Sequence, residues 1–349
     1  MKIFFRRCRW VLLPALAVFL SGCGREDVRE FRSLDTAMGT VIQQTIYATE
    51  AGTYTEDILV MLKCLEEETL SWRLKSSEVS QVNQNAGSGN WMELSAKLTQ
   101  VLKLCMELAE GTDGAFDVTL GPVARLWDID SWAMGSRTGT FEAPEAEVLG
   151  RTLAQCGPER VDFRMPQEDE CGLVRLEEGA ALDLGAVGKG FALDEICSYL
   201  EAQPGVAGAV VSVGGSVLTY GQKPDGTAWA VGIADPHDPS SNLGVLTLAG
   251  QWYISTSGDY ERYVEAGGIR YHHILDPSTG YPADSGLDSV TILAPSGLLS
   301  DALSTACFVL GREQGLLLAQ RYGAEALFVE KDGGIFMTPG MEEVFRPAN

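Results

Sequence analysis

The chain has 349 residues, and its 48 acidic side chains outnumber the 26 basic ones, which gives a formal net charge of −22 at pH 7. This balance argues against nucleic acid as a partner, because binding to phosphate backbones needs a surface rich in Lys and Arg. The length is large for one domain but still compatible with one.

The first 22 residues combine basic side chains with a short apolar run, the pattern of a secretory signal peptide. The residues Leu20-Ser21-Gly22-Cys23 resemble the bacterial lipobox, which implies cleavage before Cys23 and lipidation of its thiol. The alternative is an ordinary signal peptide that is cut nearby. No later segment has the length and apolarity of a transmembrane helix. We therefore expect an extracytoplasmic protein that is held at a membrane by a lipid anchor only, with residues 23–35 as anchor and polar linker.

From residue 36 onward, helix and strand periodicities are interleaved, and short turns join several of the strands. This pattern favours an α+β fold with mixed, largely antiparallel sheets packed against helices over a doubly wound parallel sheet. Strands are expected at residues 38–48, 209–215, 229–235 and 288–294, and a hairpin is expected around Asp332-Gly333-Gly334. Helices are expected after Thr55, from Ser95 to Gly111, and from about Ser296 to Leu310.

The eight cysteines include no Cys-x-x-Cys pair, which argues against a structural zinc site or a thioredoxin motif. Cys64, Cys105 and Cys307 lie on apolar stripes of expected helices, so we expect buried thiols there. An exported chain could instead form disulfides, and the sequence alone does not pair them.

The loop "ALDLGAVGKGFALD" at 181–194 places Gly185, Gly188 and Gly190 around Lys189. Glycines let a backbone approach a phosphate closely, and a lysine supplies positive charge. The spacing matches neither a Walker loop nor a Rossmann fingerprint. The loop could equally be a plain connection from a strand to a helix.

The helix expected after residue 296 carries Asp301 and Thr305, four positions apart and therefore on one face. A carboxylate and a hydroxyl in that arrangement could bind a hard cation such as Mg²⁺. The alternative is structural: Asp301 could complement the start of the helix, and Thr305 could simply pack.

Two of the three histidines are adjacent, at His272 and His273, next to the turn Asp276-Pro277. Neighbours on a strand point to opposite faces, so only one of the two can enter a given pocket. The chain has no Gly-x-Ser-x-Gly motif, which disfavours a serine hydrolase of that class. Three histidines also argue against a His-rich zinc site.

Taken together and in order, eight sequence blocks resemble the FAD:protein FMN transferases, the ApbE flavin transferases. The blocks are "TAMGT" at 36–40, "SWRLKSSEVSQVN" at 71–83, "GTDGAFDVTLGPV" at 111–123, "DLGAVGKGFALD" at 183–194, "SVGGSVLTYG" at 212–221, "STSGDYERY" at 255–263, "YHHILDPSTGYP" at 271–282 and "SDALSTACFVLG" at 300–311. The resemblance implies a T-fold-related α+β catalytic domain over residues 36–349. It also implies transfer of FMN from FAD to a Thr or Ser hydroxyl of an acceptor flavoprotein, with Mg²⁺ and release of AMP.

The resemblance implies roles for individual residues. His273 matches the catalytic position, Trp72 stands where many members have Tyr, and Lys189 would neutralise the pyrophosphate. The residues expected at the FAD site are Met38, Trp72, Ala115, Phe116, Asp117, Asp183, Lys189 and Leu275. The residues expected to bind the metal are Asp301, Thr305 and, through its backbone carbonyl, Ala186.

These roles agree with elementary chemistry. Removal of residues 1–22 takes away four basic and no acidic side chains, which leaves 22 basic against 48 acidic, a net charge of −26. A pyrophosphate would need local cations in such a chain, and histidine suits a base near neutral pH. We expect His273 to face the site and His272 to be structural. Two alternatives stay open: an Mg²⁺-dependent FAD pyrophosphatase that releases FMN and AMP, and a non-catalytic FAD-binding lipoprotein.

Overall fold

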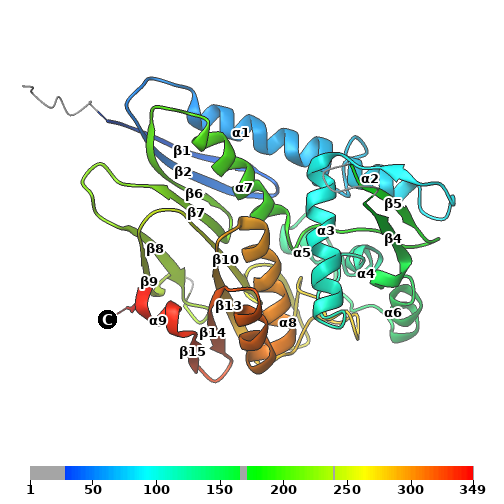
Figure 1. Cartoon of the computed structure of the whole chain (residues 1–349). Coiled ribbons are helices and arrows are strands. Elements are labelled where there is room, and N and C mark those ends of the chain that lie inside the picture. Colours follow the sequence, from blue (N-terminus) through cyan, green and yellow to red (C-terminus); the bar gives the residue numbers. More distant parts are fainter. Residues whose placement is uncertain (1–27, 166–170, 239, 349) are drawn as a thin grey trace, which may run out of the picture.

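A computed structural model describes residues 28–165, 171–238 and 240–348. Its centre is an eight-stranded sheet in which every neighbouring pair of strands is antiparallel (Figure 1). In spatial order the strands are β1 (Arg29–Ala37), β2 (Thr40–Ala48), β6 (Val206–Val213), β7 (Ser216–Gly221), β10 (Trp252–Gly258), β13 (Leu287–Ala294), β14 (Glu325–Glu330) and β15 (Ile335–Met337). The expected α+β class with largely antiparallel sheets is confirmed.

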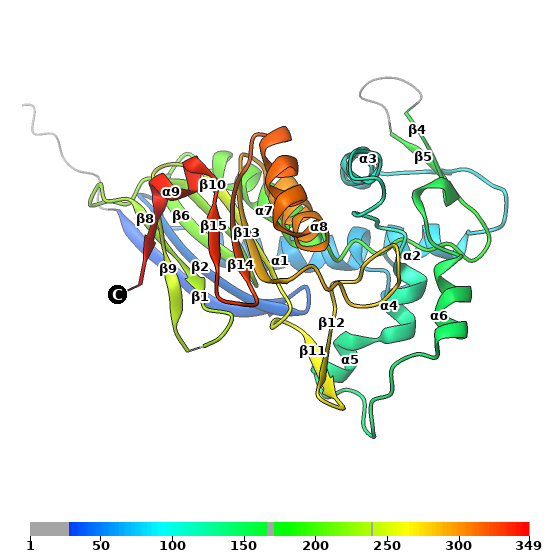
Figure 2. The same ribbon diagram turned by 90° about the horizontal axis from the view of Figure 1, so that it is seen from below.

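Both faces of the large sheet are covered, which explains why all eight residues of β13 are buried. One face packs against α1 (Tyr54–Leu65), α7 (Gly188–Glu201) and α8 (Gly297–Arg321). The other face packs against a small sheet of β8 (Trp229–Ala234), β9 (Asn242–Leu248) and β16 (Phe345–Pro347), with α9 (Pro339–Val344) beside it (Figure 2). The main core therefore lies between the large sheet and its helices.

A second group of elements lies beside α8, on the right in Figures 1 and 2. It contains a three-stranded sheet, several short helices and a hairpin that packs against α5. The elements are η1 (Glu66–Leu70), α2 (Glu78–Gln84), β3 (Met92–Glu93), α3 (Ala96–Gly111), α4 (Gly121–Trp127), α5 (Ile129–Ala133), α6 (Ala146–Leu153), η2 (Pro158–Arg160), β4 (Val161–Arg164), β5 (Leu173–Leu176), β11 (Tyr263–Ala266) and β12 (Ile269–His272).

Local sequence signals place the helix starts well. Ser95 caps α3 by accepting a hydrogen bond from the Leu98 amide, and Ser296 caps α8 in the same way through Leu299. The helix expected from Ser296 ends at about Leu310 as expected, because two helical segments that meet at a kink make up α8. Gly311 interrupts it with φ 76° and ψ 176°, a backbone conformation that glycine accepts readily, and the helix then resumes.

Three other expectations need correction. Residues 29–35 are not a linker, because they belong to β1, whose Phe31 packs edge-on against Tyr54 at 5.2 Å between ring centroids. Thr55 does not cap α1; it is a buried residue inside that helix. Met38 begins no strand, because Met38 and Gly39 form the β1–β2 turn with φ of 52° and 66°.

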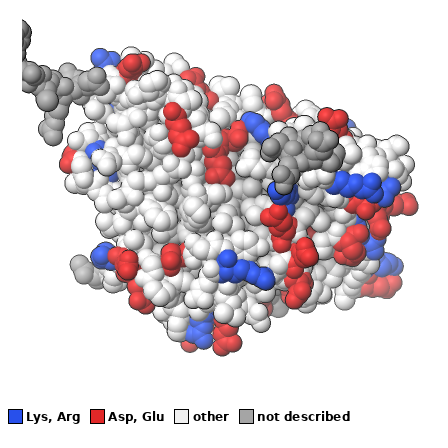
Figure 3. Space-filling view, viewed as in Figure 1, with Lys and Arg blue, Asp and Glu red and all other residues white. Residues whose placement is uncertain are grey.

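The described cysteines are unpaired, and Cys105 and Cys307 are buried as expected, whereas Cys64 is exposed on α1. None of the helices in residues 28–348 that the structure describes is long and apolar enough to cross a membrane. The signal peptide and the Cys23 anchor fall outside the described residues. Figure 3 shows basic side chains dispersed among acidic ones on the face that it draws.

Candidate functional site

A cavity opens between the α7–α8 pair and the second group of elements. The structure brings most of the expected site residues to its wall, although they come from distant segments of the chain. The expected residues that line it are Met38, Trp72, Ala115, Phe116, Asp117, Asp183, Ala186, Lys189, His273, Leu275 and Thr305. Asp301 lies just behind this wall, where the side chain of Lys189 reaches it.

The wall at α7 and α8 is held by direct contact between two helix backbones. A Cβ atom added to Gly190 would lie 2.0 Å from the carbonyl oxygen of Gly297, and one added to Gly297 would lie 2.2 Å from that of Gly190. Across this contact, the Gly190 amide donates to Asp301 Oδ2 at 2.9 Å. Gly190 therefore serves the packing of α7 against α8. At this position the alternative of a structural connection is correct.

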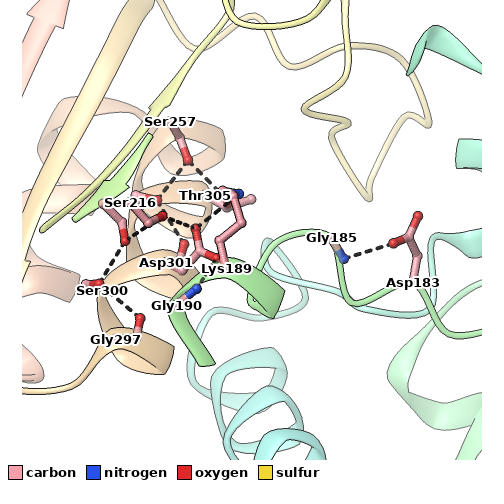
Figure 4. A network of polar contacts seen from close by, with 12 residues as sticks. Asp183, Gly185, Lys189, Gly190, Ser216, Ser257, Gly297, Ser300, Asp301 and Thr305 are labelled. Carbon is pink, nitrogen blue, oxygen red and sulfur yellow. Dashed lines mark hydrogen bonds and ion pairs between the residues drawn. The ribbon is translucent and has the colours of Figure 1, made fainter. Parts of the chain in front are cut away.

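The other glycines of the loop do face the cavity. Gly188 and Gly185 both line it, and a Cβ at Gly188 would meet nothing closer than 3.7 Å. The Gly185 amide donates to Asp183 Oδ1 at 2.9 Å, beside the network around Asp301 in Figure 4. Burial raises the pKa of Asp183. The missing side chain at Gly188 leaves space for a ligand at the start of α7, although the Gly188 amide already donates to the Leu184 carbonyl at 2.9 Å.

Asp301 is buried, with 2% of its surface exposed, yet one of its oxygens is only loosely bound. Its Oδ1 lies 3.5 Å from Lys189 Nζ and 3.4 Å from Ser216 Oγ, both long for charge-assisted contacts. Thr305 follows one turn later on α8 and lies 3.3 Å from Ser257 Oγ (Figure 4). The carboxylate therefore keeps acceptor capacity next to a hydroxyl.

This donor set fits a magnesium ion better than a softer metal. Asp301, Thr305 and the Ala186 carbonyl offer oxygen atoms only, as Mg²⁺ prefers, and Mg²⁺ commonly keeps few protein ligands. The described residues contain no group of three or more His, Cys, Asp or Glu side chains that could hold a metal ion.

The two adjacent histidines point to different surroundings. His272, at the end of β12, is buried edge-on against Phe308, and its Nε2 lies 3.1 Å from the Ala283 carbonyl. His273 follows the strand and lines the cavity. Burial, followed by the charge of Arg262, lowers the pKa of His273 to about 3 despite the opposing effect of Asp130. The ring is therefore neutral at pH 7 and keeps a lone pair on one ring nitrogen.

Trp72 and Asp117 line the cavity on the side of the second group. The guanidinium groups of Arg73 and Arg125 lie 4.1 and 5.0 Å from the Trp72 ring centroid. Among the residues that the structure describes, the buried Nε1 of Trp72 has no hydrogen-bond partner, so it can donate to a ligand. Asp117 accepts from the Thr119 amide and hydroxyl, and burial raises its pKa.

The sequence reasoning missed several polar residues of the cavity. Ser257, Glu261 and Arg262 stand inside a quoted sequence block, and Arg73 follows Trp72, but none of them was assigned a role. Asp130 on α5 carries no motif at all, yet it pairs with both Arg73 and Arg262. Only the fold brings these three side chains together.

A polar cavity with a buried carboxylate, a lysine and a neutral histidine is typical of an enzyme active site. The chain belongs to the ApbE family, whose sequence model matches residues 38–328. A FAD:protein FMN transferase from Treponema pallidum is 34% identical over 97% of this chain and 96% of its own length. The FAD:protein FMN transferase from Escherichia coli K12 is 30% identical over 97% of this chain and 96% of its own.

Solved structures agree with this assignment. The ApbE protein from Thermotoga maritima superposes with a TM-score of 0.80 at 31% identity, and covers 91% of this chain and all of its own. The apo form of the flavinyl transferase ApbE from Pseudomonas stutzeri gives a TM-score of 0.76 at 28% identity, over 92% of this chain and 98% of its own.

Proposed function

We propose that this enzyme transfers FMN from FAD to a Thr or Ser hydroxyl of an acceptor flavoprotein and releases AMP. The name of its relatives supports FAD as donor and a protein as acceptor. The observation that carries the proposal is the cavity itself. It brings Lys189, at the start of α7, and a neutral His273 to the lining of one cavity.

In this reaction the acceptor oxygen forms a bond to the phosphorus of the FMN half of FAD. The bond from that phosphorus to the bridging oxygen breaks, and the electron pair leaves with AMP. His273 takes the proton of the hydroxyl, which a neutral imidazole can do and an imidazolium cannot. The ammonium group of Lys189 opposes the charge of the pyrophosphate.

The residues proposed to hold Mg²⁺ are Asp301, Thr305 and the carbonyl of Ala186. A bound Mg²⁺ would supply Lewis-acid stabilisation of the charge that develops on the phosphate oxygens. The loosely bound Oδ1 of Asp301 supports this assignment, because a buried carboxylate otherwise calls for a closer cationic partner. A direct test is binding of Mn²⁺, a spin-active substitute for Mg²⁺, to the chain with and without Asp301→Asn.

One experiment separates transfer from the two alternative functions. The purified domain is incubated with FAD and Mg²⁺, with and without a candidate acceptor flavoprotein. AMP together with a covalently fluorescent acceptor supports the transferase. AMP with free FMN indicates a pyrophosphatase, and intact FAD indicates a binding protein; either result with a competent acceptor would refute the proposal.

We also propose that the mature protein is an extracytoplasmic lipoprotein anchored through Cys23. The charged start, the short apolar run and Leu20-Ser21-Gly22-Cys23 support this proposal. Cys23→Ala should abolish incorporation of a labelled fatty acid, while a chain that lacks residues 1–23 stays active. Labelling that persists in Cys23→Ala would contradict the anchor.

A further inference from the structure

Asp130 joins two arginines that are far apart in the sequence. Its Oδ2 accepts from Arg73 Nη2 at 2.7 Å and its Oδ1 accepts from Arg262 Nη1 at 3.1 Å. The pair with Arg262 is the more sheltered, since the side chains of Arg262 and Arg73 are 28% and 51% exposed. Burial acts to raise the pKa of Asp130, but Arg262 and then Arg73 outweigh it and hold the pKa below its usual range.

Arg262 contacts His273 through its main chain. Its carbonyl oxygen accepts a hydrogen bond from the His273 amide at 3.1 Å and lies 3.3 Å from the Nδ1 of the same residue. A carbonyl oxygen can only accept, so Nδ1 must carry the ring proton when this bond forms. The lone pair of the neutral ring is then on Nε2, the nitrogen left to meet a ligand in the cavity.

We propose that Asp130 is a positioning residue for the transfer reaction, because its hold on the Arg262 side chain keeps the Arg262 carbonyl against His273 Nδ1. This inference rests on the proposed role of His273 as base. Arg73 extends the same chain of contacts to Trp72, on which it stacks. The carboxylate of Asp130, on the five-residue helix α5, thus links two parts of the cavity. Through Arg73 it is connected to Trp72, and through Arg262 it is connected to the ring of His273.

Several charged groups face His273 and bear on its titration. Arg262, Lys189 and His272 lower its pKa, after burial, while Asp130 raises it. Arg262→Gln removes the largest of the lowering charges, so the pKa of His273 should rise toward 6.5. Because the base must be unprotonated, transfer by Arg262→Gln should fall off at a higher pH than transfer by the unaltered enzyme. Asp130→Asn should produce no such upward shift.

The tautomer can be observed directly, since the chain contains only three histidines. Long-range ¹H–¹⁵N spectra of the ¹⁵N-histidine-labelled protein, assigned with His237→Gln and His272→Gln, report which ring nitrogen carries the proton. We expect a neutral Nδ1–H form of His273 in the unaltered protein and a mixture of tautomers in Asp130→Asn. An identical His273 signal in both proteins would overturn the proposal.

Kinetics provides a second, independent readout. Asp130→Asn and Arg262→Gln should each lower kcat roughly tenfold, the effect of one hydrogen bond, while KM for FAD changes less than about twofold. The double variant should be no worse than the poorer single variant, because both changes break one connection. Fully additive losses, or kcat near that of the unaltered enzyme in Asp130→Asn, would contradict the proposal.

Arg270→Gln is the matched control. Arg270 lies on β12, in the hairpin that follows Arg262, and its guanidinium group pairs at the same 3.1 Å distance with Asp259 and not with Asp130. It should leave kcat unchanged, and an equal loss would show that loosening of the hairpin alone explains the effect. Near-normal transfer by His273→Ala would refute the base and with it the positioning role. Lost transfer in His273→Ala with an unchanged tautomer in Asp130→Asn would refute the positioning role alone.

Discussion

The two walls of the cavity are built in different ways. The wall at α7 and α8 depends on backbone contact between Gly190 and Gly297, with Asp301 buried behind it. The opposite wall depends on ion pairs of Asp130 with Arg73 and Arg262, whose side chains are partly exposed. Backbone contact leaves little room for adjustment, whereas exposed ion pairs are individually weak and sensitive to salt.

This difference indicates that the two walls of the cavity have different functions. The tightly packed wall keeps the oxygen ligands proposed for the metal in constant positions, which suits a small ion with strict geometry. The charged wall holds His273, the proposed base, through the Arg262 carbonyl. Substitutions in the first wall should therefore act on metal binding and stability, and those in the second wall on the rate of transfer.

His273→Ala should give the largest effect on rate. Loss of a positioned general base typically lowers the rate about 10²- to 10⁴-fold, and FAD binding should persist because its expected contacts come mainly from other segments. AMP release and acceptor fluorescence measure the rate, and a fluorescence titration measures FAD binding. His237→Ala is the control, because that histidine pairs with Asp288 and has 52% of its side chain exposed. Normal transfer by His273→Ala would assign the base to another group.

Asp301→Asn should lower FAD cleavage roughly 100-fold at ordinary Mg²⁺ concentrations, with partial recovery as Mg²⁺ is raised. Asn is a better replacement than Ala, because its side-chain oxygen can still accept from the Gly190 amide. Ala would leave that buried amide unpaired and would mix a loss of stability with a loss of metal. A Mg²⁺ dependence equal to that of the unaltered enzyme would refute the assignment of Asp301 as a ligand.

Gly190→Ala should lower the free energy of unfolding by about 3 kcal/mol, since the new methyl group cannot fit against the Gly297 carbonyl. Urea unfolding measures the loss. Gly188→Ala is the matched control in the same helical turn, because its added Cβ meets no atom within 3.7 Å. Equal stability of the two variants would show that the helix contact relaxes easily.

His272→Asn should change how stability depends on pH. Burial, opposed by Asp259, lowers the pKa of His272 in the folded protein, so the unfolded chain binds the proton more tightly. The unaltered protein should therefore lose stability as the pH falls below about 6.5, by at most about 1.4 kcal/mol per pH unit from this group. Comparison of unfolding free energies at pH 7 and 5.5 should show a smaller loss in His272→Asn. A larger loss in the variant would contradict this sign.

The sequence by itself determined those features of this protein that depend on residues close together in the chain. Ser95 and Ser296 mark the starts of α3 and α8 because a cap needs only a side chain and an amide three residues away. The four-residue spacing of Asp301 and Thr305 sets them on one helix face, and the adjacency of His272 and His273 separates their surroundings. The eight sequence blocks, because they occur together and in order, are also enough to indicate the family.

Only the tertiary structure decided which of several local interpretations holds. Gly190 could have served a phosphate or a helix contact, and its neighbour Gly297 comes from another helix that the local pattern does not specify. The polar segment at 29–35 has the composition of a linker, yet it pairs with β2 as strand β1. Asp130 has no sequence signal, because its contacts to Arg73 and Arg262 exist only after distant segments meet. Long-range packing decides such contacts, since a side chain's neighbours in space are not encoded by its neighbours in sequence.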